Sequence, residues 1–189
     1  KAAIEIILNE TGRVYTSFFS NSSTGKFLLS LPAGNNYGIS VSAEGYLFHS
    51  ENFDLPKGDG FNSVTKDVEL KNIKVGSNIT LRNVFFDSGK WEVKDDSFPE
   101  LARLVLLLND VPSLKIEISG HTDNVGAESF NELLSQRRAD AVVDYLVENG
   151  VNVERLSSIG YGQTNPVDSN DTAESRASNR RTEFEIIEN

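Results

Sequence analysis

The chain of 189 residues contains no cysteine, so neither a disulfide nor a thiolate metal site can form. It also lacks any apolar run near the roughly 20 residues needed to cross a bilayer, the longest run being residues 104–108. The sequence shows neither an initiating methionine nor a signal peptide, and a strand pattern begins almost at once. We therefore expect the chain to be a piece of a longer protein whose targeting segment lies outside it.

Positive charge is also scarce. The chain has 18 lysine and arginine residues against 28 aspartate and glutamate residues, which gives a formal net charge of −10. Nucleic acids and anionic membrane surfaces both attract basic segments. The charge therefore argues against a nucleic-acid partner and against adhesion to a membrane through charge. Any membrane connection is expected from a part of the protein outside this chain.

The first 70 residues show short apolar or alternating segments separated by turns, with no helical period. Short strands joined by turns rich in glycine and asparagine are typical of a small β-sandwich. We expect strands at residues 3–8, 14–19, 27–31, 37–41 and 64–70.

The run TGKFLLSLPAGNNYGISVSAEGY, residues 24–46, resembles the carboxypeptidase regulatory-like fold. That resemblance implies a seven-stranded, transthyretin-like accessory module that acts as a spacer. Sugar binding by Tyr37, Tyr46 or Phe48 is an alternative, although aromatic residues at strand spacing belong more often to a core. A short polar segment then separates two predicted domains, residues 1–72 and 76–189.

The second predicted domain alternates strand and helix patterns. Ser97 and Glu100 have the spacing of a capping box at the start of one helix, and Gly150 ends the other. The predicted order β-α-β-α-β-β indicates an α+β fold with a mixed sheet and both helices on one face. The expected strands cover residues 79–86, 114–119, 156–161 and 181–187, the helices cover 97–109 and 128–149, and 164–176 is expected to be a polar loop.

One arginine interrupts an apolar stripe of the second helix. Arg138 lies four residues after Leu134 and four before Val142, both of which belong to the stripe. A buried arginine requires a partner, and Asp123, in the turn before the helix, is the nearest candidate. Charge considerations alone favour a structural salt bridge between Asp123 and Arg138. The alternative is a zwitterion site, in which the carboxylate binds an ammonium and the guanidinium binds a carboxylate.

Four further motifs occur in a fixed order: HTDNVG at 121–126, FNELLSQRRADAV at 130–142, GYGQTNP at 160–166 and ASNRRTEFEI at 177–186. Together they resemble the OmpA-like C-terminal domain of bacterial envelope proteins, over about residues 78–188. The resemblance implies non-covalent binding of peptidoglycan by a protein of the Gram-negative outer membrane, on its periplasmic side. It favours the ligand-binding interpretation over the structural salt bridge.

The resemblance also implies roles for residues of the turn and the second helix. The ligand would be the diaminopimelate of the peptidoglycan stem peptide, which presents an ammonium and a carboxylate on one carbon. Asp123 would bind the ammonium and Arg138 the carboxylate. Asn131 would add a hydrogen bond, and Thr122 and Asn124 would shape the turn or offer backbone N–H groups.

The same resemblance places Phe86 and Asp87 along the same cleft. The family often has a second acidic residue two positions later, where this chain has Gly89. Arg180 and Arg181 occupy the family's NRR motif, where Arg180 is equally consistent with a structural or a ligand-binding role. Arg181 is expected to be structural or a peripheral ligand contact.

Two other classes of function stay open. A metal-dependent cell-wall hydrolase would require His49, His121 and Asp123 to meet, but the two histidines fall in different predicted domains and form no helix-spaced pair. Nucleophile elbows and phosphate-binding loops are absent from the sequence, so we expect no enzyme activity, no metal and no cofactor. The remaining alternative is a protein–protein adaptor of the envelope whose cleft is idle.

Overall fold

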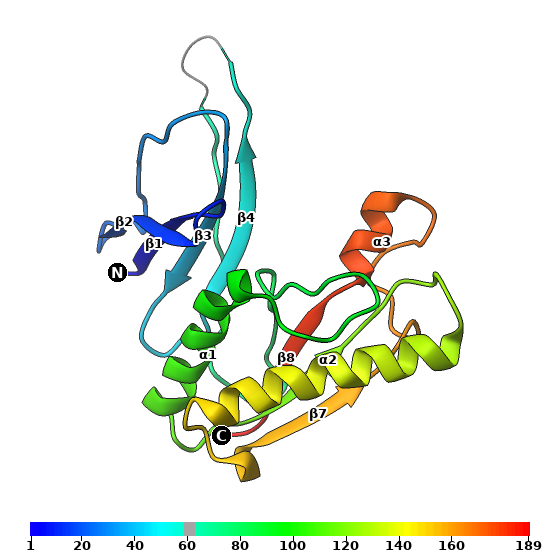
Figure 1. The fold of residues 1–189 in the computed structure, drawn as a ribbon. Helices are drawn as coiled ribbons and strands as arrows, with labels where there is room; N and C mark the ends of the chain where they lie inside the picture. Colours follow the sequence, from blue (N-terminus) through cyan, green and yellow to red (C-terminus); the bar gives the residue numbers. More distant parts are fainter. Residues whose placement is uncertain (59–62) are drawn as a thin grey trace. The chain divides into compact units, whose positions relative to one another are not determined.

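The computed structural model describes residues 1–58 and 63–189, and the chain divides into two compact units, Lys1–Ile73 and Lys74–Asn189 (Figure 1). Each unit contains one four-stranded sheet. Within the described residues, no helix combines the length and the apolar character that a membrane span requires.

The N-terminal unit is built on an antiparallel sheet in the order β2-β1-β3-β4. Its central strands, β1 (Ala3–Leu8) and β3 (Asn35–Ser42), pair along their whole length, and alternate residues of both turn apolar side chains to one core. The outer strands are β2 (Arg13–Phe19) and β4 (His49–Leu55). The buried members of this core are Ile4, Ile6, Tyr37, Ile39 and Val41.

The second sheet expected for a sandwich is not formed by the described residues. Residues 27–31 and 64–70, which we predicted as strands, lie outside every strand, whereas β4, which we did not predict, belongs to the sheet. Apolar side chains of both segments, among them Phe27, Leu29, Val68 and Leu70, nevertheless pack against the core of the sheet. Alternation of apolar residues thus identified which side chains are buried, but not whether the backbone pairs with a neighbouring strand.

The C-terminal unit contains a mixed sheet in the order β5-β8-β6-β7. Strands β6 and β7 are parallel, whereas β8 is antiparallel to both of its neighbours. The predicted mixed sheet is confirmed. The strands are β5 (Asn78–Thr80), β6 (Lys115–Gly120), β7 (Leu156–Gly160) and β8 (Thr182–Glu188).

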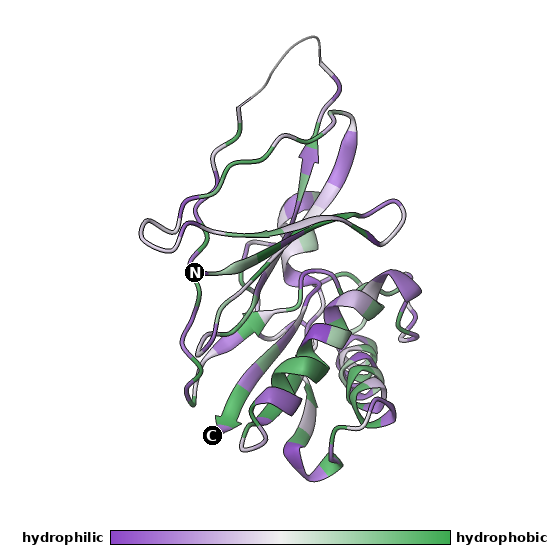
Figure 2. Ribbon diagram, turned by 90° about the vertical axis from the view of Figure 1, so that its left-hand side faces the viewer, coloured by the Kyte–Doolittle hydropathy of each residue, from purple (hydrophilic) through white to green (hydrophobic). Residues whose placement is uncertain are grey.

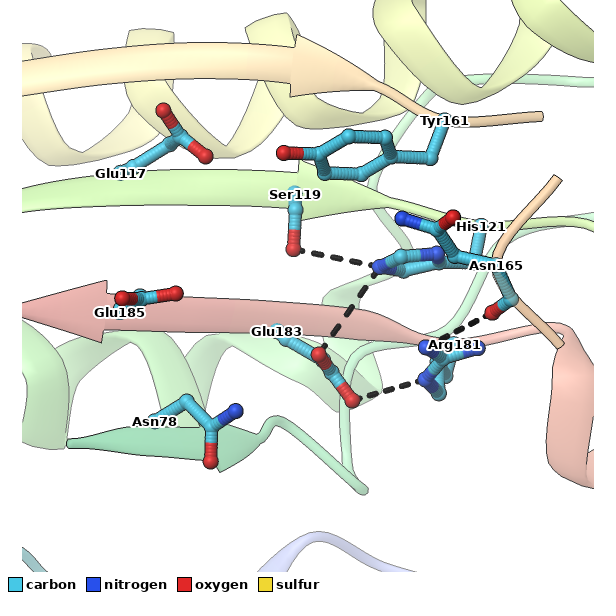
Figure 3. A pocket seen from close by; sticks show the side chains of 9 residues that line it. All are labelled: Asn78, Glu117, Ser119, His121, Tyr161, Asn165, Arg181, Glu183 and Glu185. Carbon is cyan, nitrogen blue, oxygen red and sulfur yellow. Dashed lines mark hydrogen bonds and ion pairs between the residues drawn. The ribbon is translucent and has the colours of Figure 1, made fainter. Parts of the chain in front are cut away.

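The two faces of this sheet differ in polarity. Ile118 of β6 and Phe184 of β8 are fully buried on the face that carries the helices. Figure 2 shows the alternation of hydrophobic and hydrophilic residues along β8, near the end marked C. Glu117, Glu183 and Glu185 lie on the opposite face, which Figure 3 shows with α2 passing behind the sheet. The helices are α1 (Phe98–Asp110), α2 (Glu128–Glu148) and α3 (Ala173–Asn179).

Two glycines allow α2 to lie directly on the ends of β6 and β7. A Cβ on Gly160 would lie 2.6 Å from the Cα of Gln136, and one on Gly120 would lie 2.9 Å from the carbonyl carbon of Ser135. Such distances are shorter than van der Waals contact, so neither position has room for a side chain. The first half of α2 is thereby fixed against the strand ends, where the turn that precedes it also begins.

Three local predictions differ from the structure. The first strand of the second domain, predicted at residues 79–86, is confined to β5, and residues 81–86 lie outside every strand. The Ser97 hydroxyl makes no capping hydrogen bond to α1, because it accepts a hydrogen bond of 2.8 Å from the backbone N–H of Phe85. Part of the predicted polar loop forms α3, which begins with a capping box between Thr172 and Ser175. A helix of seven residues is too short to show a clear apolar period, so its capping pair was the available signal.

Candidate ligand-binding site

The turn after β6 is held in place from two sides. The backbone N–H of Thr122 donates to the carbonyl of Gly162 at 2.8 Å, and the Thr122 hydroxyl donates to the carbonyl of Asp123 at 2.9 Å. From α2, the Asn131 side-chain amide donates to the carbonyls of Asp123 and Val125, both at 3.2 Å. The turn therefore has a defined shape before any ligand binds.

Asn131 and Asn124 also connect the turn to the loop that follows β7. Asn131 is 3% exposed, and its Nδ2 group donates to Oε1 of Gln163 at 3.1 Å. The backbone N–H of Asn124 donates to the side-chain oxygen of Asn170 at 3.3 Å. The donor group of Asn131 is thus already used within the protein. In the free protein, Thr122, Asn124 and Asn131 position the turn, and their contacts with a ligand stay a prediction.

Asp123 forms an ion pair with Arg180. One carboxylate oxygen lies 2.6 Å from Nη1 of Arg180, and the other accepts the backbone N–H of Val125 at 3.0 Å. The Asp123 side chain is 12% exposed and that of Arg180 is 47% exposed. The salt bridge that charge considerations favoured, between Asp123 and Arg138, was therefore assigned to the wrong arginine. Arg180 reaches Asp123 from the end of α3, 57 residues further along the chain.

Arg138 is half-buried and is held by backbone carbonyls. Its Nε group donates to the carbonyl of Lys90 at 2.9 Å, and its Nη2 group donates to the carbonyl of Asp87 at 3.1 Å. The guanidinium carbon lies 4.9 Å from the centroid of the Phe86 ring, a cation–π distance. Carbonyls are dipoles without net charge, so these contacts orient the guanidinium and do not neutralise its positive charge.

The pKa of Arg138 is lowered mainly by burial. The nearby positive charge of Arg180 lowers this pKa further, whereas the negative charge of Asp123 raises it. These two influences show that the three charged groups occupy one electrostatic environment. Two guanidinium groups and one carboxylate give this cluster a net positive charge in a chain that is otherwise acidic.

The segment that follows Phe86 supports Arg138 through its backbone. Phe86 forms an isolated antiparallel bridge with Val93, and the Asp87 carboxylate, which is exposed, lies 3.3 Å from Nζ of Lys94 and 3.5 Å from Nζ of Lys90. These lysines lower the pKa of Asp87. The Asp87 carbonyl contacts Arg138, while its carboxylate pairs with lysines of its own loop.

Arg181 lies apart from these groups and lines a pocket on the polar face of the sheet (Figure 3). Its Nε group donates to Glu183 at 2.7 Å, and its Nη2 group donates to the carbonyl of Asn165 at 3.2 Å. His121 lines the same pocket, where it stacks on Tyr161 with ring centroids 5.3 Å apart. Burial lowers the pKa of His121 to about 4, so the imidazole is neutral at pH 7.

The structure therefore separates the predicted residues into three groups. Asp123, Arg138 and Arg180 form the charged cluster, with Phe86 and Asp87 in direct contact with Arg138. Thr122, Asn124 and Asn131 hold the turn. Arg181 lies in the pocket on the polar face of the sheet. The sequence argument missed the carbonyl of Lys90 and the side chain of Gln163, of which the second belongs to the GYGQTNP motif.

Potential metal ligands do not gather in the part of the chain that the structure describes. Residues 1–58 and 63–189 contain no group of three or more histidine, aspartate or glutamate side chains placed to hold a metal ion. His49 lies in the N-terminal unit and His121 in the C-terminal unit.

Taken together, the mixed sheet and the helices on one face define an α+β domain with a charged cluster beyond β6. A model of the OmpA family matches residues 85–180, about half of the chain. The chain belongs to the OmpA family. The match does not include the N-terminal unit, whose similarity to the carboxypeptidase regulatory-like fold stays a prediction.

A bacterial outer-membrane protein is similar to about half of the chain. Outer membrane porin F of Pseudomonas aeruginosa is 45% identical over 105 residues, which cover 55% of this chain and 30% of porin F. The chain thus spans less than a third of that relative.

Two solved structures resemble more than half of the chain in sequence and fold. The cell wall anchor of the type VI secretion system of P. aeruginosa is 31% identical with a TM-score of 0.51, covering 59% of this chain and 80% of that one. The peptidoglycan-associated lipoprotein of Burkholderia pseudomallei is 29% identical with a TM-score of 0.50, covering 56% and 88%.

Proposed function

We propose that this protein binds peptidoglycan without covalent attachment, through the diaminopimelate of the stem peptide. It thereby anchors an outer-membrane protein to the cell wall from the periplasmic side. The observation that carries this proposal is the state of Arg138, whose guanidinium is oriented by carbonyls and an aromatic ring yet keeps its charge. The names of two solved relatives, a cell wall anchor and a peptidoglycan-associated lipoprotein, agree with it.

Two members of the charged cluster, Arg138 and Asp123, are opposite in sign to the carboxylate and the ammonium at the free end of diaminopimelate. A guanidinium has five N–H donors, and Arg138 uses two groups, Nε and Nη2, for the carbonyls of Lys90 and Asp87. Its remaining N–H donors are available to a carboxylate, which forms strong charge-assisted hydrogen bonds with a guanidinium. The carboxylate of Asp123, beside it, accepts the ammonium. Recognition of this kind needs no bond to form or break.

The orientation of Arg138 before binding contributes to affinity. A flexible arginine loses side-chain entropy when it binds a ligand, at a cost of about 0.5–1.5 kcal/mol for an immobilised side chain. Here the Phe86 ring and the two carbonyls have already fixed the guanidinium. The ligand therefore meets a preorganised group.

Substitution of Arg138 tests the assignment. We expect Arg138→Ala to weaken the binding of a diaminopimelate-containing peptide at least tenfold, or about 1.4 kcal/mol, because one charge-assisted contact is lost. Isothermal titration calorimetry measures the affinity. Arg137→Ala is the matched control, since Arg137 is the exposed neighbour on the same helix and its loss changes the net charge equally. Affinity like that of the wild type in a folded Arg138→Ala variant would refute this role.

Sedimentation with isolated peptidoglycan sacculi separates a wall binder from an adaptor. We expect the wild-type protein to sediment with sacculi, and the Asp123→Ala and Arg138→Ala variants to remain in the supernatant. A wild-type protein that does not sediment would contradict wall binding and favour the adaptor. Addition of EDTA, together with an assay of sacculus digestion, tests the metal-dependent hydrolase, for which we expect no activity.

A further inference from the structure

The carboxylate assigned to the ligand's ammonium already has a cationic partner in the protein. Both oxygens of Asp123 are engaged, one by the backbone N–H of Val125 and the other by Nη1 of Arg180. A carboxylate oxygen can accept more than one hydrogen bond. An ammonium that approaches Asp123 nevertheless competes with Arg180 for the same negative charge.

Arg180 is the partner that can leave. Its side chain is 47% exposed, and among the described residues its hydrogen-bond partner is Asp123 alone. The Val125 N–H belongs to the backbone of a turn that Asn131 and Thr122 hold in place, so it remains with Asp123. The Arg180 backbone is also fixed, through its N–H bond of 3.1 Å to the carbonyl of Arg176. Displacement therefore breaks the ion pair with Asp123 and moves the Arg180 side chain into solvent, without a change in the backbone.

We propose that Arg180 determines the specificity of the site by competing with the ligand's ammonium for Asp123. This inference rests on the proposed function. A ligand that offers an ammonium alone replaces one charged partner of Asp123 with another and gains little. A ligand that also carries a carboxylate reaches the guanidinium of Arg138, which has no carboxylate partner among the described residues. Because of Arg180, a ligand therefore needs a carboxylate in addition to its ammonium in order to bind well.

The electrostatics of the cluster point in the same direction. Arg180 and Arg138 are near enough for the charge of one to act on the other. A bound carboxylate neutralises part of this repulsion, whereas a bound ammonium adds a third positive charge beside a single carboxylate. The cluster therefore discriminates against simple amines and in favour of an amino acid head group.

The test compares two ligands on the whole chain. Diaminopimelate carries ammonium and carboxylate groups, and its diamide carries the same ammonium groups with both carboxylates converted to neutral amides. NMR titration of the wild type gives the ratio of their dissociation constants. In Arg180→Gln, which removes the competing charge, we expect the diamide to bind at least tenfold more tightly than it binds the wild type. Diaminopimelate gains less than the diamide, because Arg180 also attracts the carboxylate that only diaminopimelate carries. The preference for diaminopimelate therefore falls.

Two further variants serve as controls. Arg137→Gln removes one positive charge from the exposed surface of α2, and we expect it to leave the ratio within twofold of the wild type. Arg180→Lys retains a cation, and we expect its ratio to lie nearer the wild type than that of Arg180→Gln. Arg180→Lys also serves if Arg180→Gln fails to fold, because a lysine that abolished the preference would contradict competition by charge.

The outcomes are distinguishable. If the wild type binds diaminopimelate and Arg180→Gln leaves the ratio unchanged or raises it, Arg180 is a direct ligand contact or a structural residue and the inference is overturned. If the wild type binds neither ligand, the proposed function itself fails and the inference fails with it. If the diamide binds more tightly to Arg180→Gln but not to the control variants, the result supports competition between Arg180 and the ligand's ammonium for Asp123.

Discussion

Arg138 and Arg180 have partners of different kinds. Carbonyl groups orient Arg138 without cancelling its charge, whereas a carboxylate neutralises Arg180. We propose that the two arginines have different tasks, Arg138 to bind an anion and Arg180 to be displaced by a cation. The difference follows from the residues that reach each guanidinium, since the side chains themselves are identical.

His121 allows a prediction of how stability depends on pH. The imidazole is buried against Tyr161, and its pKa of about 4 in the folded protein lies below the value of 6.5 expected in an unfolded chain. As the pH falls below about 6.5, the unfolded chain takes up a proton that the folded protein does not bind. The free energy of unfolding therefore falls, by up to about 1.4 kcal/mol per pH unit, until the pH reaches about 4.

The variant His121→Gln isolates this contribution. Urea unfolding at pH 7, 6, 5 and 4 gives the free energy of unfolding of both proteins, and the carboxylates affect both alike. We expect the wild type to lose about 3 kcal/mol more than His121→Gln over this interval. Parallel curves for the two proteins would contradict the assignment of a buried neutral imidazole.

For single residues, the sequence predicted which side chains belong to the charged cluster but not which of them form ion pairs with one another. Asp123 and Arg138 were identified from their residue types and from the motif resemblance, and both belong to the charged cluster. The ion pair was assigned to the wrong arginine, because Arg180 comes from 57 residues beyond Asp123 and no local pattern reports so distant a contact. Arg138 is also less central to the buried stripe than its spacing indicated, since Asn131, Ser135 and Ala139 take the positions facing the sheet.

Among the elements, α2 connects the fold to the site. Its first half lies on the glycines at the ends of β6 and β7, and the same half carries Asn131, which fixes the turn. A change at the strand ends is therefore expected to affect both the stability of the domain and the geometry of the site.

Gly160→Ala tests this close packing. The added Cβ would lie 2.6 Å from the Cα of Gln136, so α2 must move away from the sheet, and we expect a loss of about 2 kcal/mol or more in the free energy of unfolding. Ser157→Ala in the same strand is the control, because it removes only a long hydrogen bond of 3.5 Å. Urea unfolding measures both. An unaltered stability of Gly160→Ala would show that α2 tolerates a side chain at this position.

Long elements with a clear period were predicted well, and short polar ones were not. The strands β6, β7 and β8 and the helix α2 lie within about a residue or two of the predicted bounds. The strand β4 has the sequence HSENFDL, in which polar residues conceal the alternation of buried and exposed positions. The buried residues of α3, Ser175 and Asn179, are both polar, so this helix shows no apolar stripe. Packing with distant segments determines such elements, so their own sequence carries little signal.

For the whole molecule, the two compact units indicate separate domains, and we propose bounds near the predicted 1–72 and 76–189. A polypeptide of residues 74–189 has its own sheet, its own helices and the complete charged cluster. We expect it to fold cooperatively and to bind diaminopimelate within threefold of the affinity of the whole chain. Circular dichroism and calorimetry measure these properties. Loss of cooperative unfolding in the shortened protein would contradict the independence of the C-terminal unit.

The position of β8 in its sheet also affects the order in which the domain can assemble. This strand is the last of the domain in sequence, yet it lies between β5 and β6 and joins them. During synthesis, or during transport across a membrane with the N-terminus leading, β5 and β6 lack their shared neighbour until residues 182–188 emerge. The sheet of the C-terminal unit is therefore completed last, and we expect this unit to fold only when nearly all of its residues are available.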